Sequence, residues 1–234
     1  MLIDFDKVVN KSHKTKYKNR SPLWPQHPFR CIIVGSSSSG KTSGALNIIH
    51  NSVFHHIYLY CKTAEDKYEW LVDEQLKKEK ELRGQGINEK LVTYSNNIDD
   101  VVDVDSLDET KQNLVIFDDF CLEANKVQRE KISDFFIRSR KFNCSVLYIS
   151  QSFFSIPKII RLNSNYCALH AINDKRELKT IHNIYLSDIP FNEFNEKYNM
   201  AIASYSNHGC LLIDTIIPHK QLRLRANYSD IFHN

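Results

Sequence analysis

The chain has 234 residues and a net charge of only +3, with 42% hydrophobic and 25% charged residues. This length suits one domain, and the composition is that of a folded globular protein rather than a disordered or fibrous one. It contains neither a long apolar run nor an apolar N-terminal leader, so we expect no membrane span and no export.

The cysteines indicate an intracellular protein. They occupy positions 31, 61, 121, 144, 167 and 210, and no two are closer than 23 residues. Metal sites usually need a closely spaced pair, so we expect no cysteine metal site. Most of them lie in or beside apolar runs, which predicts buried thiols in a reducing compartment.

The charge is unevenly distributed along the chain. The first thirty residues carry seven basic side chains, and residues 99–109 carry six acids without a base. We interpret residues 1–28 as a basic N-terminal arm, which is either a phosphate- or partner-binding segment or simply a solvated tail. Residues 29–234 are then predicted to form a single domain.

Apolar runs alternate with helical patterns after this arm. The runs that we expect to be strands are 29–34, 56–61, 91–94, 114–117, 144–149, 166–172 and 209–217. Helices are expected after residue 42, over 65–83 and over 125–141, the last with Val127, Ile132, Phe135 and Phe136 on its buried side. Residues 99–111 are expected to form a short helix or a loop. This alternation predicts an α/β fold with a mostly parallel sheet flanked by helices.

The turn after the first strand carries a complete phosphate-binding motif. Gly35-Ser36-Ser37-Ser38-Ser39-Gly40-Lys41-Thr42 matches G-x-x-x-x-G-K-[ST], and Ser43 follows it into the predicted helix. Glycines allow the backbone N–H groups to turn toward phosphate oxygens, and the helix N-terminus faces the same phosphates. Lys41 is expected to reach the β- and γ-phosphates of ATP, and the Thr42 hydroxyl to bind Mg²⁺. The motif predicts a P-loop NTPase.

Two acids follow the apolar strand 114–117. Asp118 is expected to hold Mg²⁺ through its water shell, and Asp119 to orient or deprotonate the attacking water. Two acids at this place favour hydrolysis over transfer to a bound acceptor. The next strand ends at Gln151, which is our candidate for a sensor of the γ-phosphate.

Basic residues occur before that strand and near the C-terminus. Arg138 or Arg140 is a candidate arginine finger that reaches the nucleotide of a neighbouring subunit, and Arg161 is a third candidate. A solvated basic helix end is the alternative. A patch of Lys220, Arg223 and Arg225 either lines a nucleic-acid channel or is a solvated end.

These motifs together resemble one superfamily over residues 28–175. The phosphate loop, the run Val115-Ile-Phe-Asp-Asp119 and the segment from Arg138 to Gln151 resemble the FtsK–HerA superfamily of DNA-pumping ATPases. The segment from Ser155 to Asn165 is similar to its viral branch, the genome-packaging ATPases of poxvirus-like large DNA viruses, virophages and related transposons. The second motif departs from the common Asp-Glu by being Asp-Asp.

The resemblance implies a RecA/FtsK-like fold and a ring of five or six identical subunits around double-stranded DNA. It also implies ATP sites between subunits, partners at the capsid or portal vertex, and hydrolysis that drives the viral genome into a preformed capsid inside the host cell. Two other functions remain compatible with the motifs, namely a small-molecule or nucleotide kinase and a non-translocating ATP-gated switch.

Overall fold

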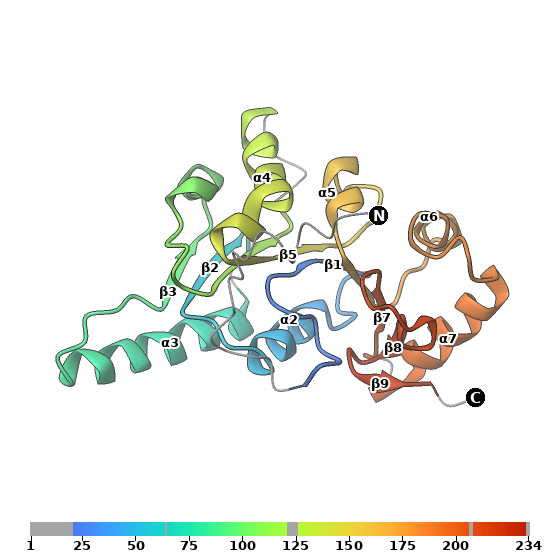
Figure 1. The fold of residues 1–234 in the computed structure, drawn as a ribbon, viewed down its shortest axis with the longest axis horizontal. Helices are drawn as coiled ribbons and strands as arrows, with labels where there is room; N and C mark the ends of the chain where they lie inside the picture. Colours follow the sequence, from blue (N-terminus) through green and yellow to red (C-terminus); the bar gives the residue numbers. More distant parts are fainter. Residues whose placement is uncertain (1–20, 64, 121–125, 206–207, 233–234) are drawn as a thin grey trace, which may run out of the picture.

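The computed structural model describes residues 21–63, 65–120, 126–205 and 208–232. In this part of the chain nine strands form one sheet in the order β3-β2-β4-β5-β1-β6-β7-β8-β9 (Figure 1). The strands are β1 (Arg30–Val34), β2 (His56–Cys61), β3 (Val92–Ser95), β4 (Asn113–Asp118), β5 (Cys144–Ser150), β6 (Tyr166–Leu169), β7 (Leu211–Asp214), β8 (Leu224–Ala226) and β9 (Asp230–Ile231).

The sheet is parallel from β3 to β6, and β7 to β9 continue it in antiparallel pairs. The predicted α/β fold with a mostly parallel sheet is therefore confirmed. The prediction did not include β8 and β9, which have only three and two residues. Because β1 lies between β5 and β6, the turn after β1 opens next to the carboxyl ends of both neighbours.

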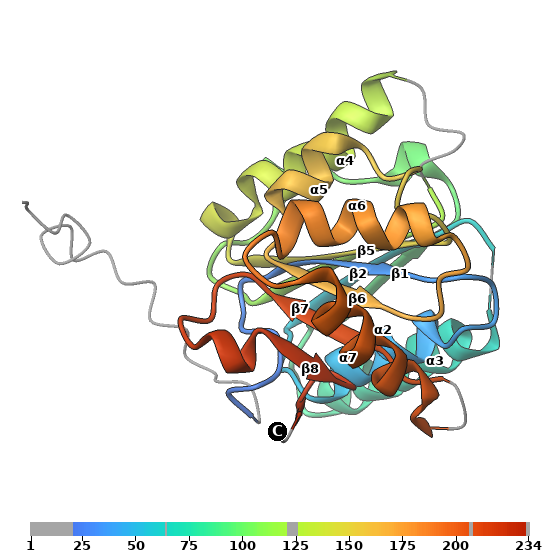
Figure 2. The same ribbon diagram turned by 90° about the vertical axis from the view of Figure 1, so that its right-hand side faces the viewer.

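Helices cover both faces of the sheet (Figures 1 and 2). α2 (Lys41–His50) and α3 (Asp66–Gly84) lie on one face, and α4 (Lys126–Arg138), α5 (Lys158–Asn163) and α6 (Lys175–Tyr185) lie on the other. α7 (Phe191–Ala203) packs beside β7 and β8. Short 3₁₀ turns are η1 (Ile98–Asp100), η2 (Val104–Ser106), η3 (Ser139–Phe142) and η5 (Lys220–Leu222).

The central strands are buried on both faces, which explains their continuous apolar runs. In β1, Cys31 and Ile33 pack into the core on the α2–α3 side, whereas Ile32 and Val34 pack into the core on the α4–α6 side. The predicted buried side of α4 is correct for Ile132, Phe135 and Phe136. It is wrong for Val127, whose side chain is 71% exposed, because only the second half of α4 packs on the sheet.

The N-terminal segment that is described lies against the domain. The indole of Trp24 stacks on the Tyr228 ring at a centroid distance of 5.2 Å, and His27 hydrogen-bonds Ser145 Oγ and Asn143 Oδ1 at 2.7 and 2.9 Å. Residues 1–20 of the predicted basic arm lie outside the described residues. The five described cysteines are free and buried, as predicted, and Cys121 lies outside the described part.

The C-terminal basic patch is not an open basic surface. Arg225 is fully buried and donates to Asp214 Oδ2 at 2.9 Å and to the Tyr228 carbonyl at 3.2 Å. Arg223 and Lys220 both pair with Asp188, at 2.8 and 3.2 Å. The interpretation of this patch as a nucleic-acid channel therefore fails for Arg225, which is buried and paired, whereas Lys220 is exposed and shares the single Asp188 carboxylate with Arg223.

Removing the buried guanidinium should strongly lower the free energy of unfolding. In Arg225→Met the Asp214 carboxylate stays buried without its cation, so we expect a loss of about 3–5 kcal/mol in the free energy of unfolding. The matched control is Lys220→Met, which breaks an exposed pair and should cost under about 1 kcal/mol. Urea unfolding of both variants measures this, and similar small losses in both would contradict the structural role of Arg225.

Candidate active site

The phosphate loop spans the turn between β1 and α2. The N–H groups of Gly35 and Ser36 are bonded to the carbonyls of Ser150 and Ala171, at 3.3 and 2.8 Å, which anchors the loop base to β5 and β6. Gly40 has a φ of 98°, a conformation that glycine adopts without strain. At the start of α2 the first N–H groups have no intrahelical acceptor. The loop therefore presents backbone donors at a helix N-terminus, which is an anion site.

Lys41 lies in this loop as the motif predicts. Its side chain is buried, and its Nζ donates to the Ser36 carbonyl at 2.9 Å. Burial lowers the pKa of Lys41, while the carboxylates of Asp119 and Asp118 oppose this effect. The ammonium group thus stands between the loop backbone and the two strand-end acids, where a phosphate chain would meet it.

A histidine that directly follows β6 contacts the loop. His170 is 2% exposed, and its Nδ1 lies 3.0 Å from the Ser39 carbonyl. Burial lowers the pKa of His170 to about 4, so the ring is neutral at pH 7 and its Nδ1–H donates to that carbonyl. A Cβ added at Gly35 would lie 2.6 Å from the His170 Cβ. Glycine at position 35 therefore lets the loop approach this histidine closely.

Asp118 stands at the carboxyl end of β4, opposite the loop. Its side chain is buried, and its Oδ2 accepts a 2.6 Å hydrogen bond from the Tyr68 hydroxyl of α3. Burial raises the pKa of Asp118 to about 6; Asp119 and Glu65 add to this rise, while the Tyr68 hydrogen bond and Lys41 oppose it. At pH 7 this carboxyl is mainly ionised and is held in one orientation by Tyr68.

The raised pKa of Asp118 predicts a pH-dependent stability. Because its folded value of about 6 exceeds the ordinary 3.8, this group stabilises the nucleotide-free fold fully below about pH 4, and the contribution is lost as the pH rises through 6. We expect the Tm of the wild type to fall relative to that of Asp118→Asn between pH 4.5 and pH 7.5. Calorimetry of both proteins without nucleotide or magnesium measures this, and a constant difference would contradict the assignment.

Asp119 follows in a strained turn. Its φ of 54° is unusual for a residue other than glycine, and its N–H donates to the Ile149 carbonyl at 3.2 Å. Its Oδ2 accepts a 3.0 Å hydrogen bond from Gln151 Nε2. The two sequence-predicted groups that would handle water are therefore in direct contact.

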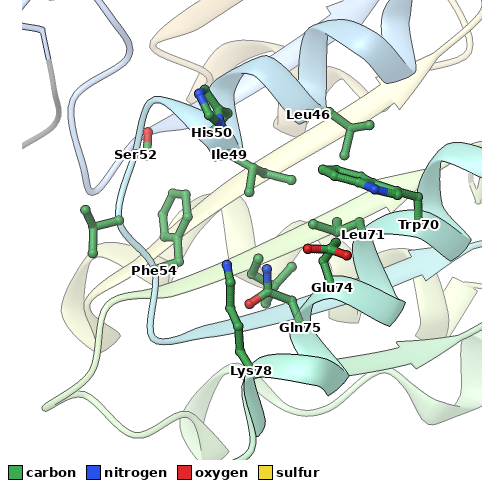
Figure 3. Close-up of a pocket in the computed structure, with 12 residues that line it drawn as sticks. Leu46, Ile49, His50, Ser52, Phe54, Trp70, Leu71, Glu74, Gln75 and Lys78 are labelled. Carbon is green, nitrogen blue, oxygen red and sulfur yellow. The ribbon is translucent and has the colours of Figure 1, made fainter. Parts of the chain in front are cut away.

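These groups line one cavity of about 430 Å³. Its walls are the loop from Ser37 to Thr42, the two acids, Gln151, and Glu65, Lys67 and His208. Another hollow, between α2 and α3, contains none of the predicted site residues; it is lined by apolar side chains such as Leu46, Ile49 and Trp70 together with a few polar ones (Figure 3). The chemistry therefore belongs to the cavity at the phosphate loop.

The comparisons agree with this geometry. The family described as Poxvirus A32 protein matches residues 15–187, which is well over half of the chain. The chain belongs to this family. No curated protein sequence matches it.

Solved structures share its fold. The genome packaging NTPase B204 from Sulfolobus turreted icosahedral virus 2, in complex with AMPPCP, matches with a TM-score of 0.53 at 11% identity, over 85% of this chain and 96% of that one. B204, the DNA-packaging ATPase from Sulfolobus turreted icosahedral virus, matches with a TM-score of 0.53 at 14% identity, over 88% and 99%. Likeness at such identities establishes the fold, and the predicted P-loop NTPase fold is thereby confirmed.

The candidate arginine fingers of this A32-family chain lie away from its own phosphate loop. Arg138 ends α4, so it lies toward the amino end of β5, whereas the loop lies at the carboxyl end. Its guanidinium pairs with Asp134 at 2.9 Å and also with Asp105. Arg140 is exposed and has no ion pair within the described residues. Arg140 is therefore the freer of the two to reach another subunit.

Sequence reasoning missed several residues of the site. Tyr68 lies in α3 and His170 directly after β6, and nothing in their local sequence marks them as partners of Asp118 and Ser39. Lys67 donates to Ser43 Oγ at 2.8 Å, so Ser43 faces α3 and lies outside the residues that line the phosphate cavity. These contacts form only when helices and strands distant in sequence are brought together.

In the described part of the chain no helix has the length and apolar character needed to cross a bilayer.

Proposed function

We propose that this chain is an ATP-hydrolysing motor that translocates double-stranded viral DNA into a preformed capsid. The observation that carries the proposal is the single cavity in which the phosphate loop, Asp118, Asp119 and Gln151 meet. Membership of the Poxvirus A32 family supports it, as does the fold shared with proteins named as genome packaging NTPases. The motor is proposed to act inside the host cell, with the capsid or portal vertex as its partner.

The site fits a magnesium–nucleotide complex. Mg²⁺ prefers oxygen ligands and is usually held by one or two protein groups together with phosphates and waters. Thr42 and Asp118 supply a hydroxyl and a buried carboxylate beside the loop, and we assign the ion to them. When bound, the ion would neutralise charge on the phosphate oxygens.

Different residues of the chain are proposed to bind the nucleotide and to activate the water. The loop amides and Lys41 hold the triphosphate, and Tyr68 keeps the Asp118 carboxylate in place. Asp119 and Gln151, joined at 3.0 Å, hold the attacking water, and Asp119 accepts its proton. This arrangement supports water as the acceptor rather than a second substrate.

We further propose that the motor is a ring of five or six subunits in which Arg140 acts on the neighbour's nucleotide. If it does, mixing Arg140→Ala subunits with Lys41→Ala subunits, each inactive alone, should restore part of the ATPase activity, because some sites then combine an intact phosphate loop with an intact Arg140 of the neighbour. Arg138→Ala is the matched comparison, because its guanidinium is already held by Asp105 and Asp134. A mixture that stays as inactive as its two components would contradict an action in trans.

Phosphate release measured with and without double-stranded DNA tests the function. Strong stimulation by DNA is the expected result for the motor. Phosphate transfer to a nucleotide or small-molecule acceptor would instead identify a kinase. ATP binding without turnover in either condition would identify a nucleotide-gated switch, and both of these results contradict the motor.

A further inference from the structure

A second cavity, of about 660 Å³, opens between the first half of α4 and the segment that leads into α5. Its basic lining residues are Lys126, Arg129, Lys158 and Arg161, with Glu130 as its acid and Phe154 as its aromatic residue. We call this cavity the α4–α5 cleft. The helices α4 and α5 lie on the opposite face of the sheet from α2 and α3 (Figures 1 and 2).

The cleft carries cations that the fold does not neutralise. Lys126 and Glu130 form an exposed pair at 3.8 Å, which contributes little to stability. Arg129 and Lys158 are exposed and have no ion pair in the described ranges. Elsewhere on this face, Lys131 and Arg138 are both paired with carboxylates. Four cations against one acid therefore leave the cleft strongly basic.

Arg161 is the most constrained of these cations. Its guanidinium lies over the Phe153 ring, 5.0 Å from the centroid, and its Nε is buried without a hydrogen-bond partner in the described part of the chain. Stacking on this ring limits the freedom of the guanidinium and holds its charge at the cleft. Phe154, 48% exposed, adds an apolar surface beside the cations.

A short braced segment connects the cleft to the nucleotide cavity. Gln151, which contacts Asp119, is separated by only six residues from Lys158. The segment is held by a 2.8 Å hydrogen bond between Ser150 Oγ and Ser155 Oγ and by a 2.7 Å bond from Ser155 Oγ to the Ser152 carbonyl. The cleft and the nucleotide cavity therefore lie at the two ends of one short segment of the chain.

We infer that the α4–α5 cleft grips the phosphate backbone of double-stranded DNA. The inference rests on the proposed packaging function and names the surface that would perform it. A motor that moves DNA of any sequence needs contacts to phosphates rather than to base edges, and lysine and arginine side chains supply such contacts. The cleft offers several of them, from Lys126, Arg129, Lys158 and Arg161.

The test measures DNA affinity against salt concentration for the full chain with magnesium and a non-hydrolysable ATP analogue. The variant is Arg129→Ala/Lys158→Ala, and the control is Lys80→Ala/Arg83→Ala, which removes the same two charges from exposed positions on α3. Each lost phosphate contact lowers the slope of log K against log salt by about 0.9. We expect a slope smaller by about 2 and an affinity roughly 60-fold lower at 0.1 M salt for the variant.

The control double variant should keep the wild-type slope, and binding of the ATP analogue, measured separately, confirms that each variant is folded. A cleft variant that keeps the wild-type slope would overturn the inference and leave the packaging function standing. An acidic protein bound in the cleft in place of DNA would likewise overturn the inference. A wild type that does not bind double-stranded DNA would instead overturn the packaging function itself.

Discussion

Lys41→Ala should lower ATP turnover by about 10²–10³-fold or more, because one charged donor to the transferring phosphoryl group is lost. The ammonium group is buried between the loop and the two acids, whereas Lys67, another lysine that lines the cavity, is bonded to Ser43. Steady-state phosphate release measures the effect. Binding of labelled ATP shows how much of the loss arises before the chemical step.

The control for Lys41→Ala is Lys67→Ala, which removes a cation that lines the same cavity but bonds Ser43 instead of facing the acids. We expect Lys67→Ala to lower ATP turnover by less than about tenfold, which is the range for the loss of a single exposed hydrogen bond. Equal losses in the two variants would mean that only the total charge of the cavity matters. Retained turnover in Lys41→Ala would contradict the assignment of the phosphate site.

Asp119→Asn should abolish most hydrolysis and leave nucleotide binding nearly unchanged. A positioned general base contributes typically 10²–10⁴-fold, and the amide cannot accept the proton. Asparagine also tolerates the left-handed backbone at φ 54° and still offers an oxygen to Gln151, so the turn should persist. Single-turnover phosphate release and ATP binding are the two measurements.

The Asp118→Asn variant distinguishes the roles proposed for the two acids. Because Asp118 is assigned to the metal rather than to water, its variant should raise the magnesium concentration needed for turnover, whereas Asp119→Asn should not. Hydrolysis at the wild-type rate in Asp119→Asn would refute the role given to that residue. A magnesium shift in Asp119→Asn without one in Asp118→Asn would mean that the roles are exchanged.

The local motifs explain why much of the site was predictable. The phosphate loop is one continuous stretch of sequence, and so is the strand that ends at Asp118. Parallel strands bring their carboxyl ends to one edge of the sheet. That topology also placed Gln151 beside Asp119. Residue type and spacing were therefore sufficient to predict that these groups meet in one cavity, and their roles in hydrolysis stay predictions.

Tertiary contacts account for what could not be predicted. Arg225 looks like any surface arginine until β8 pairs with β7 and buries it against Asp214. Tyr68 belongs to a highly charged helix, and only the docking of α3 brings its hydroxyl to Asp118. The exposed Val127 shows the same dependence, since helical periodicity cannot tell where a sheet stops covering a helix.

A structure of the protein with magnesium and a non-hydrolysable ATP analogue tests the central claim most directly. We expect the triphosphate to lie on the backbone from Ser37 to Thr42, with its last phosphate between Lys41 Nζ and the carboxylates of Asp118 and Asp119. A nucleotide bound elsewhere, for example in the hollow between α2 and α3, would contradict the claim and the motor proposed from it.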